Sequence, residues 1–389
     1  MKWTNRGILI LLVLGASVAV AEASTPAITI AVDCGKGQSL NRTLSNLDKH
    51  TPYTVAVNGT CTEYVQVIGF ENLTVKGMTG ATLMQPTTGA SSLFDGFLFI
   101  ASRSVTIEGF SIQADTVTVP AVGIGHGSSD IRLRNLKVQG GTEGIIVFEN
   151  SQVSISHVTA RDPGYATLGV YDSSDVHIER SVFKDSTGAP WHAGIDVGAS
   201  HVTMYGTTIS NMQEGITGHG GAIVDVLAYN TTVGANDVTI DNSAGTNYNG
   251  VTIDTGGSLN VFSKLVINKA GQSWGGTTAG VLISDGAALT ASNGNLVITG
   301  SHGHGIMVLN NSHATISGAT VTGGSHGGLV LANQSSIDVS GGTILTLIGG
   351  NSVDLFCDPT SMITGGMNLA GIPSAQCTNL LAGETVPLP

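Results

Sequence analysis

The chain has 389 residues, of which 54 are glycine, 11% are charged and only 5% are aromatic. Its formal net charge of −12, from 15 basic and 27 acidic side chains, disfavours nucleic acid as a partner, because nucleic-acid binding depends on basic patches. A hydrophobic content of 41% argues against disorder and predicts a packed core.

Residues 1–23 have the features of a secretory signal peptide. Lys2 and Arg6 form a basic start, residues 7–20 are apolar, and Ala21-Glu22-Ala23 is a small-x-small cleavage site. The alternative is a membrane anchor, which the short apolar run disfavours. No other stretch is long and apolar enough for membrane insertion. We therefore expect a protein secreted to the periplasm or the extracellular space, with 13 basic and 26 acidic side chains and a net charge of −13 after cleavage.

A short helix is expected after the signal peptide. Leu40, Leu44 and Leu47 recur at helical spacing in QSLNRTLSNLDKH, and the polar residues between them give the segment a second, hydrophilic face. The repeats that follow would expose a sheet edge at their open end, which invites aggregation unless it is covered. We predict that this helix lies across that end as a cap.

A twelve-residue pattern recurs through most of the remaining chain. It consists of a small residue, an apolar-x-apolar strand, a polar turn and a second apolar-x-apolar strand, as in GIIVFENSQVSI. An isolated pair of such strands cannot bury its apolar face, so the copies must stack on one another. Clear copies begin at Gly96, Gly144, Gly250, Gly280, Gly305 and Gly328.

A third short apolar strand precedes most copies, and the intervals between copies vary from 21 residues (Gly194 to Gly215) to 35 residues (Gly215 to Gly250). Variable loops between constant strands, with three strands per turn, predict an all-β parallel β-helix of about eleven turns. We expect one elongated unit: residues 1–23 the signal peptide, 24–61 an N-terminal cap with its helix, 62–356 the β-helix, and 357–389 a C-terminal cap and tail.

Four cysteines flank the repeats: Cys34 and Cys61 before them, Cys357 and Cys377 after them. Three pairings are formally possible. We predict a disulfide within each end, because a rod keeps its two ends far apart. A metal site is the alternative, and no CxxC spacing supports it.

Polar residues occupy the same turn in successive copies. Examples are Asn150-Ser151, Ser173-Ser174, Asn310-Asn311-Ser312 and Asn333-Gln334-Ser335. Stacked amide and hydroxyl groups can satisfy one another along such a ladder, so we assign these residues to stability and not to function.

The organisation as a whole resembles the right-handed parallel β-helix superfamily typified by pectate lyases, pectin lyases, polygalacturonases and pectin methylesterases. The resemblance covers residues 28–377 and implies a right-handed, single-stranded coil. It implies no single activity, because the superfamily includes lyases, hydrolases, esterases, epimerases and tailspikes. Of the polygalacturonase motifs only GHG is present, around His126, His219 and His304, and chance accounts for it in a chain this rich in glycine.

In the enzymes that the chain resembles, substrate lies along the outer face of the first strand of each turn, beside the loop entering that strand. Asp196 is the one ionisable residue at the outward position of these strands, and His192 and Glu214 stand just before two of them. The loop before Gly194 adds Lys184. We assign acid/base roles to Asp196, Glu214, His192 and Lys184, since two carboxylates in different environments can divide acid from base work.

Aromatic residues near the same turns, and on the longest loops, offer flat apolar faces for sugar rings. We assign binding roles to Trp191, Tyr171, Tyr248 and Trp274. The competing interpretation of the polar residues is that they are solvated turn positions, where Asp, His and Asn are favoured in any protein.

The sequence therefore predicts a secreted, monomeric β-helix protein that contacts polysaccharide or a cell-surface glycan. The missing catalytic motifs favour a non-catalytic binding or surface module, and the alternative is a polysaccharide lyase or glycoside hydrolase. No cofactor is expected. Calcium is the one ion considered, with Asp172, Asp175 and Asp196 as oxygen ligands that could bridge this acidic protein to an acidic sugar.

Overall fold

The computed structural model describes residues 26–87, 96–186, 192–227, 237–242, 248–270, 278–293, 295–322, 326–339, 345–348, 353–365 and 375–377. For residues 345–348, 353–354, 365 and 375–377 only the backbone is described. The expected signal peptide, Trp191 and Trp274 lie outside the described residues.

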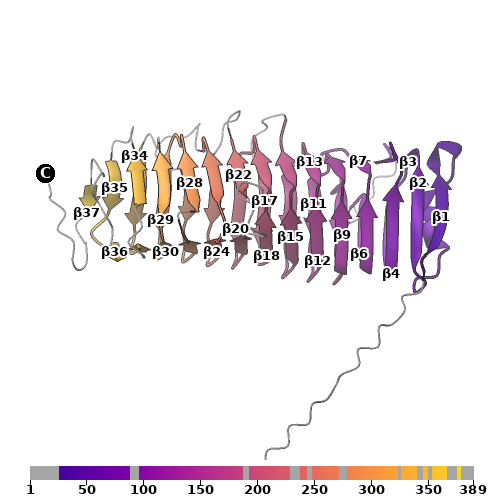
Figure 1. Ribbon diagram of the computed structural model, residues 1–389, viewed down its shortest axis with the longest axis horizontal. Helices are drawn as coiled ribbons and strands as arrows, with labels where there is room; N and C mark the ends of the chain where they lie inside the picture. The colour runs from indigo at the N-terminus through magenta and orange to yellow at the C-terminus, as the bar shows by residue number, and fades with distance from the viewer. Residues whose placement is uncertain are drawn as a thin grey trace, which may run out of the picture.

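The chain winds into a long rod of short parallel strands, with β1 at one end and β37 at the other (Figure 1). Each strand pairs in parallel with the equivalent strand of the next turn, as the repeat pattern predicts. Hydrogen bonding divides the described strands into sheets of 25 and 12 strands. The larger sheet bends, so that it presents two faces, here called the first and the second face.

The first face carries the strand that opens each repeat. Its strands are β8 (Val122–Ile124), β11 (Glu143–Val147), β14 (Ala166–Val170), β17 (Ala193–Gly198), β20 (Glu214–His219), β23 (Val251–Ile253), β26 (Ala279–Ile283), β29 (His304–Leu309), β32 (Gly327–Ala332), β35 (Val353–Cys357) and β37 (Ala375–Cys377).

The second face carries the strand that closes each repeat. Its strands are β1 (Ile28–Asp33), β2 (Tyr53–Asn58), β9 (Ser129–Arg134), β12 (Gln152–Ser156), β15 (Asp175–Glu179), β18 (His201–Tyr205), β21 (Ile223–Val226), β24 (Ser258–Val261), β27 (Ala288–Ala291), β30 (His313–Ile316), β33 (Ser336–Val339) and β36 (Met362–Gly365). Two longer strands, β4 (Val65–Gly77) and β6 (Leu98–Glu108), run through both faces.

The 12-stranded sheet, here called the third sheet, is built from the third strand of each turn. Its strands are β3 (Thr60–Thr62), β5 (Thr82–Met84), β7 (Ser111–Gln113), β10 (Lys137–Gln139), β13 (Thr159–Arg161), β16 (Val182–Lys184), β19 (Thr208–Ser210), β22 (Val238–Asp241), β25 (Leu265–Asn268), β28 (Leu296–Thr299), β31 (Ala319–Thr322) and β34 (Leu345–Ile348).

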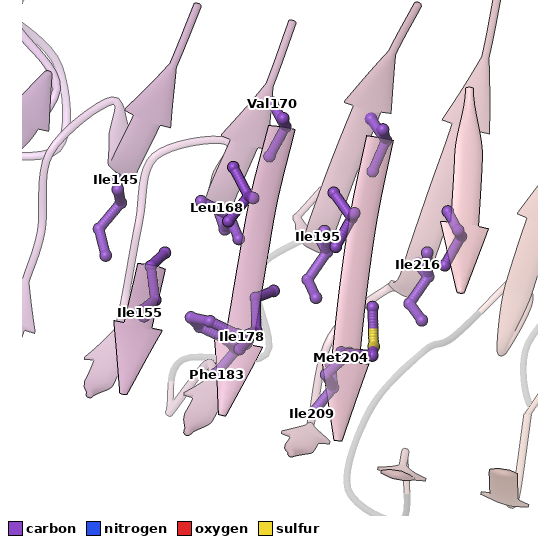
Figure 2. Packing of buried hydrophobic residues seen from close by; sticks show 14 of the residues in the cluster. Ile145, Ile155, Leu168, Val170, Ile178, Phe183, Ile195, Met204, Ile209 and Ile216 are labelled. Carbon is purple, nitrogen blue, oxygen red and sulfur yellow. The ribbon is translucent and has the colours of Figure 1, made fainter. Parts of the chain in front are cut away.

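The core consists of columns of apolar side chains that run along the rod. In-register pairing places Ile145, Leu168, Ile195 and Ile216 one after another behind the first face (Figure 2). All four are fully buried, because alternate side chains of a strand point to opposite sides. Ile306 and Leu329, further along, are also buried and paired with each other. The predicted interior is therefore confirmed.

Single residues in the left-handed backbone conformation turn the chain from the second face into the third sheet. They stand at the same corner in successive turns, with φ of 51° at Asn135, 55° at His157 and 45° at Arg180. The backbone N–H of His157 donates to Glu179 O at 3.1 Å, and that of Arg180 donates to Tyr205 O at 3.1 Å. The corner thus stays hydrogen-bonded from turn to turn although it is only two residues long.

A ladder of buried serines joins the turns between the first and second faces. The backbone N–H of Ser151 donates to Ser174 Oγ at 3.1 Å, and that of Ser174 donates to Ser200 Oγ at 3.1 Å. The same contact recurs further along the rod from Ser335 to Ser361 at 3.3 Å. The structural role assigned to these turn residues is confirmed for Ser151, Ser174 and Ser335, whereas the buried hydroxyl of Ser312 has no hydrogen bond to any described residue.

The N-terminal end is closed as the sequence predicts. Helix α1 (Leu40–Ser45), which follows the short 3-10 helix η1 (Cys34–Lys36), buries Leu40 and Leu44 completely against the core. Cys34 and Cys61 form the predicted disulfide, with a Cα–Cα distance of 5.1 Å.

Cys357 is disulfide-bonded as well, and the strand register sets it opposite Cys377, whose side chain lies outside the described part. The pairing of these two cysteines with each other stays a prediction. None of the helices in the described residues has the length and apolar character needed to cross a membrane.

The serine ladder yields a stability prediction. Replacing Ser174 by alanine removes the acceptor of the buried Ser151 N–H, which should lower the free energy of unfolding by about 1–3 kcal/mol, measured by chemical denaturation. Ser154→Ala is the matched control, because Ser154 is half-buried on the outer side of β12 and its hydroxyl has no hydrogen bond to any described residue. Equal losses in the two variants would show that the ladder contributes nothing specific.

Candidate functional site

A pocket of about 280 Å³ opens on the outer side of the first face. Tyr165, His192, Ala193, Gln213, Glu214, Thr217 and Tyr248 line it. This volume is near the lower limit of small-ligand pockets, which span roughly 300–1,000 Å³. It is suited to one ring-sized group.

The pocket lies where three successive turns bring their outward side chains together. Strand pairing sets Gly169 of β14 beside Asp196 of β17, and Asp196 beside Thr217 of β20. Because the neighbouring residues along each strand point into the core, the side chains of Asp196 and Thr217 point outward, and Gly169 occupies an outward position without a side chain. The strand register that aligns the buried side chains in columns therefore also places the outward residues of the site next to one another.

Two tyrosine hydroxyls converge on Asp196 (3% exposed). Tyr171 donates to Asp196 Oδ2 at 2.8 Å, and Tyr165 donates to the same oxygen at 3.2 Å. The other carboxyl oxygen, Oδ1, has no hydrogen bond to any described residue, and His219 Nδ1 lies 3.5 Å from it. Asp196 thus lies at the centre of a polar cluster with Tyr165, Tyr171 and His219, next to the pocket.

Burial in this cluster raises the pKa of Tyr165 to about 12, and the negative charge of Asp196 acts in the same direction. Burial, followed by the charge of Asp196, also raises the pKa of Tyr171. Both phenols therefore stay protonated near neutral pH. They remain hydrogen-bond donors to Asp196, and Tyr165 presents its ring to the pocket.

Two glycines leave the room that Tyr171 needs. A Cβ atom at Gly169 would lie 2.6 Å from the Tyr171 ring, and a Cβ atom at Gly198 would lie 3.0 Å from the same ring and 2.9 Å from His219 Nε2. Any larger residue at these positions would displace the aromatic side chains. The glycines thus act through Tyr171, since they allow its hydroxyl to reach Asp196.

Glu214 lies in the pocket itself, at the first position of β20. It accepts hydrogen bonds from Thr217 Oγ1 at 2.8 Å and from Thr252 Oγ1 at 3.3 Å. Asn249 supports this arrangement, because its amide nitrogen donates to Thr252 Oγ1 at 3.0 Å. Burial nevertheless raises the pKa of the Glu214 carboxyl, and the charge of Asp196 adds to this. A carboxyl group of this kind holds its proton to higher pH than a solvated one.

His192 brings a second type of acid/base group to the pocket. Its Nδ1 lies 2.8 Å from Asp185 Oδ2, and the Asp185 side chain is fully buried. A carboxylate at Nδ1 fixes the ring and favours the tautomer whose Nε2 is an acceptor. Among the described residues nothing bonds to His192 Nε2.

The structure brings together most of the residues that the sequence assigns to the site. Glu214, His192 and Tyr248 line the pocket, and Asp196 and Tyr171 form the cluster beside it. Sequence reasoning missed Tyr165, and it attributed the GHG triplet around His219 to chance. Tyr165 stands in a loop with no recurring pattern, and His219 belongs to one of three GHG triplets that only the fold tells apart.

Lys184 is not part of this pocket. It is the third residue of β16, in which Phe183 points into the core, so its side chain lies on the outer side of the third sheet. There it lines a separate groove together with Arg161. Its sequence neighbour Asp185 turns the other way and contacts His192.

The described residues contain one group of three metal-ligating side chains within reach of one another, formed by Cys34, Cys61 and Glu63. It does not fit a metal ion, because the two cysteines are bonded to each other. Glu63 instead accepts hydrogen bonds from the start of helix α1, at Leu40 N (2.7 Å) and Ser39 Oγ (2.5 Å). Asp172, Asp175 and Asp196, considered for calcium, do not meet in such a group.

A comparison with protein families finds a match to the model described as "Right handed beta helix region". The match covers residues 61–233 and 120–296, which together span 61–296 and hence more than half of the chain. A search of curated proteins finds no match.

A comparison with solved structures also finds matches at low sequence identity. The A-module of the mannuronan C-5 epimerase AlgE4 from Azotobacter vinelandii is 12% identical, with 92% of this chain and 91% of that chain covered and a TM-score of 0.39. The receptor-binding tailspike protein of bacteriophage Det7 is 11% identical, with coverages of 92% and 77% and a TM-score of 0.40. A DFA-IIIase from Arthrobacter chlorophenolicus is 9% identical, with coverages of 86% and 89% and a TM-score of 0.38. These identities are too low to transfer what those proteins bind to this chain.

The raised pKa of Glu214 makes stability depend on pH. The folded state binds this proton more tightly than the unfolded state, so the contribution is fully present below the unfolded value of 4.5 and is lost as pH rises through the folded pKa. Glu214→Gln has no proton to lose. Its melting temperature relative to the native chain should therefore increase as pH is raised from about 4 to about 8.

Glu179→Gln is the control for this measurement, because it makes the same substitution on the second face, away from the pocket. The Glu179 carboxylate there lies 3.1 Å from the guanidinium of Arg180. A pH-independent difference for the Glu214 variant would contradict a raised carboxyl pKa.

Proposed function

We propose that this chain, which belongs to the family of right-handed β-helix proteins, is a carbohydrate-active enzyme whose active site is the pocket lined by Glu214 and His192. One observation carries the proposal. A carboxyl group with a raised pKa and a histidine backed by a buried carboxylate line the same pocket. Acid/base catalysis needs two such groups in different environments.

The proposed reaction is hydrolysis of a glycosidic bond. Glu214, in its protonated form, donates its proton to the leaving oxygen as the bond from that oxygen to the sugar carbon breaks. His192 accepts a proton from water through Nε2 while the water oxygen forms the new bond to the same carbon. Asp185 stabilises the imidazolium that results.

Asp196 has a different role in this proposal from the one assigned on sequence. It lies behind the tyrosines, outside the residues that line the pocket, and both phenol hydroxyls donate to it. We assign it to positioning Tyr165. Tyr165 and Tyr248, which both line the pocket, then supply apolar ring surface for a sugar.

The electrostatics favour a neutral sugar at this pocket. The charges of Asp196, Glu214 and Glu143 all act on Tyr165, so carboxylates surround the site. An acidic sugar placed among them would be repelled, whereas hydroxyl groups can donate hydrogen bonds to them. The proposed substrate is therefore a neutral polysaccharide, contacted outside the cytoplasm. The Cys34–Cys61 disulfide supports such a compartment.

The competing proposal is the non-catalytic binding module favoured by the sequence. The two differ in one observable, the release of product. A panel of neutral and uronic acid polysaccharides should be screened with the full chain for both retention and new reducing ends. Retention without product on every polymer would support the binding module, and the absence of both would contradict either proposal.

Glu214→Gln should lower kcat/KM by about 10²- to 10⁴-fold, because the amide cannot donate the catalytic proton. For the native chain, activity should fall as pH rises through the raised pKa of Glu214, since only the protonated carboxyl is the acid. Glu179→Gln, on the second face, serves as the control and should retain full activity. Unchanged activity in the Glu214 variant would rule out the assigned role.

A further inference from the structure

A second polar groove lies on the third sheet, away from the pocket. Its volume is about 210 Å³, and it spans the neighbouring strands β7, β10, β13 and β16. Each of these strands has three residues, the middle one buried, so that the first and third residues point outward. The side chains that line it are Ser111, Gln113, Lys137, Gln139, Thr159, Arg161 and Lys184, with a small contribution from Val138.

Three cations therefore gather on three successive turns of a protein that has 15 basic and 27 acidic residues. Arg161 and Lys184 are directly paired in the strand register, at the strand spacing of roughly 4.8 Å. Like charges directly opposite each other on neighbouring strands destabilise a sheet. The arrangement costs the folded protein stability unless an anion lies between the two side chains.

One ion pair offsets this repulsion in part. Lys137 and Lys184 form no ion pair with any described residue, and the nearest carboxylate to Arg161 is that of Asp162, at 3.8 Å. The other oxygen of Asp162 is occupied by Ser186, which donates to it from both its backbone N–H and its hydroxyl.

Two cations on the second face, Lys76 and Arg103, are paired more closely. Lys76 has Glu108 at 3.0 Å, and Arg103 has Glu71 at 2.9 Å. The three cations of the groove thus share one ion pair, the 3.8 Å contact of Arg161 with Asp162, whereas Lys76 and Arg103 each have a closer carboxylate partner.

The groove also orients its central donor. Arg161 Nη2 donates to Gln139 Oε1 at 2.7 Å, which fixes the guanidinium across the strands. The amide nitrogen of Gln139 and the hydroxyl of Thr159 stand beside it as neutral donors. A fixed guanidinium between two ammonium groups is the donor set that recognises an oxyanion with two or three oxygens.

We propose that this groove binds the carboxylate or sulfate group of an anionic polysaccharide, at a site separate from the pocket. The residues that line it include no aromatic side chain on which a nucleic-acid base could stack. Single-stranded nucleic acid, with its regularly spaced phosphates, is therefore disfavoured against a sugar polymer. The role of Lys184 accordingly changes from the catalysis assigned on sequence to binding of an anion.

The test measures binding of the full chain to a polyuronate, to dextran sulfate and to neutral dextran by calorimetry at low salt. The double variant Arg161→Gln, Lys184→Gln should bind the anionic polymers at least tenfold more weakly. Raised salt should weaken the binding of the native chain, because screening reduces charge attraction. The first two polymers distinguish a carboxylate from a sulfate ligand.

The double variant Lys76→Gln, Arg103→Gln is the matched control, because it removes the same two charges from the second face. It should bind as the native chain does. Equal loss in both double variants would overturn the proposal by showing that overall charge, not the groove, attracts the polymer. Equal binding of single-stranded DNA, or no binding of either anionic polymer, would overturn it as well.

A second measurement does not depend on choosing the right polymer. Removing one of the two opposed cations should relieve their repulsion, so Lys184→Gln should melt at a higher temperature than the native chain in low salt. Sodium sulfate should raise the melting temperature of the native chain more than that of the variant. A Lys184→Gln variant that is less stable than the native chain would contradict the opposition of charges on which the site depends.

Discussion

In-register stacking of one coil on the next is the constraint on which the rest of this structure depends. Every strand must pair with its equivalent one turn away, so residues at equivalent positions fall into columns. A column that faces inward must be apolar throughout, as Ile145, Leu168 and Ile195 are, because a single polar side chain there would have no partner. Buried polar groups can satisfy each other from turn to turn, as Ser151 and Ser174 do.

The same constraint builds the site. Residues in the outward columns do not pack in the core, so their side chains can differ in type from one turn to the next. Asp196 and Thr217 are adjacent because the columns behind them are adjacent. The rod therefore acts as a rigid frame on which chemistry is set by a few outward residues and by the loops that enter the first face. It also separates two sites of opposite charge, since the pocket and the basic groove are on different sides of the coil.

The sequence predicted the fold because a column repeats its signal in every turn. Small residues and alternating aliphatic residues at fixed places are enough to define the strands, the cap and the N-terminal disulfide. Site residues carry no such repetition. Glu214 and His192 could be selected because they stand just before an aliphatic strand, which fixes their side of the coil. Tyr165 could not, since it reaches the pocket from a loop whose path no periodicity describes.

Two further features depended on fit in three dimensions. Tyr171 reaches Asp196 only because Gly169 and Gly198 leave space across two strands, and nothing local to Tyr171 reveals this. Lys184 and Asp185 are consecutive, so alternation alone sets their side chains on opposite sides. It does not show that Asp185 contacts His192, seven residues further along the chain.

The N-terminal closure restrains the first coil in two ways. Cys61, which is crosslinked to Cys34, stands two residues before Glu63, which accepts a hydrogen bond from Leu40 N at the start of helix α1. The first coil is therefore held both by a disulfide and by a helix cap. In a stack whose units touch only their immediate neighbours, unfolding can begin at an end and proceed inward. The crosslink and the helix cap both raise the free energy needed to open the first coil, so they protect the stack from unravelling at its N-terminal end.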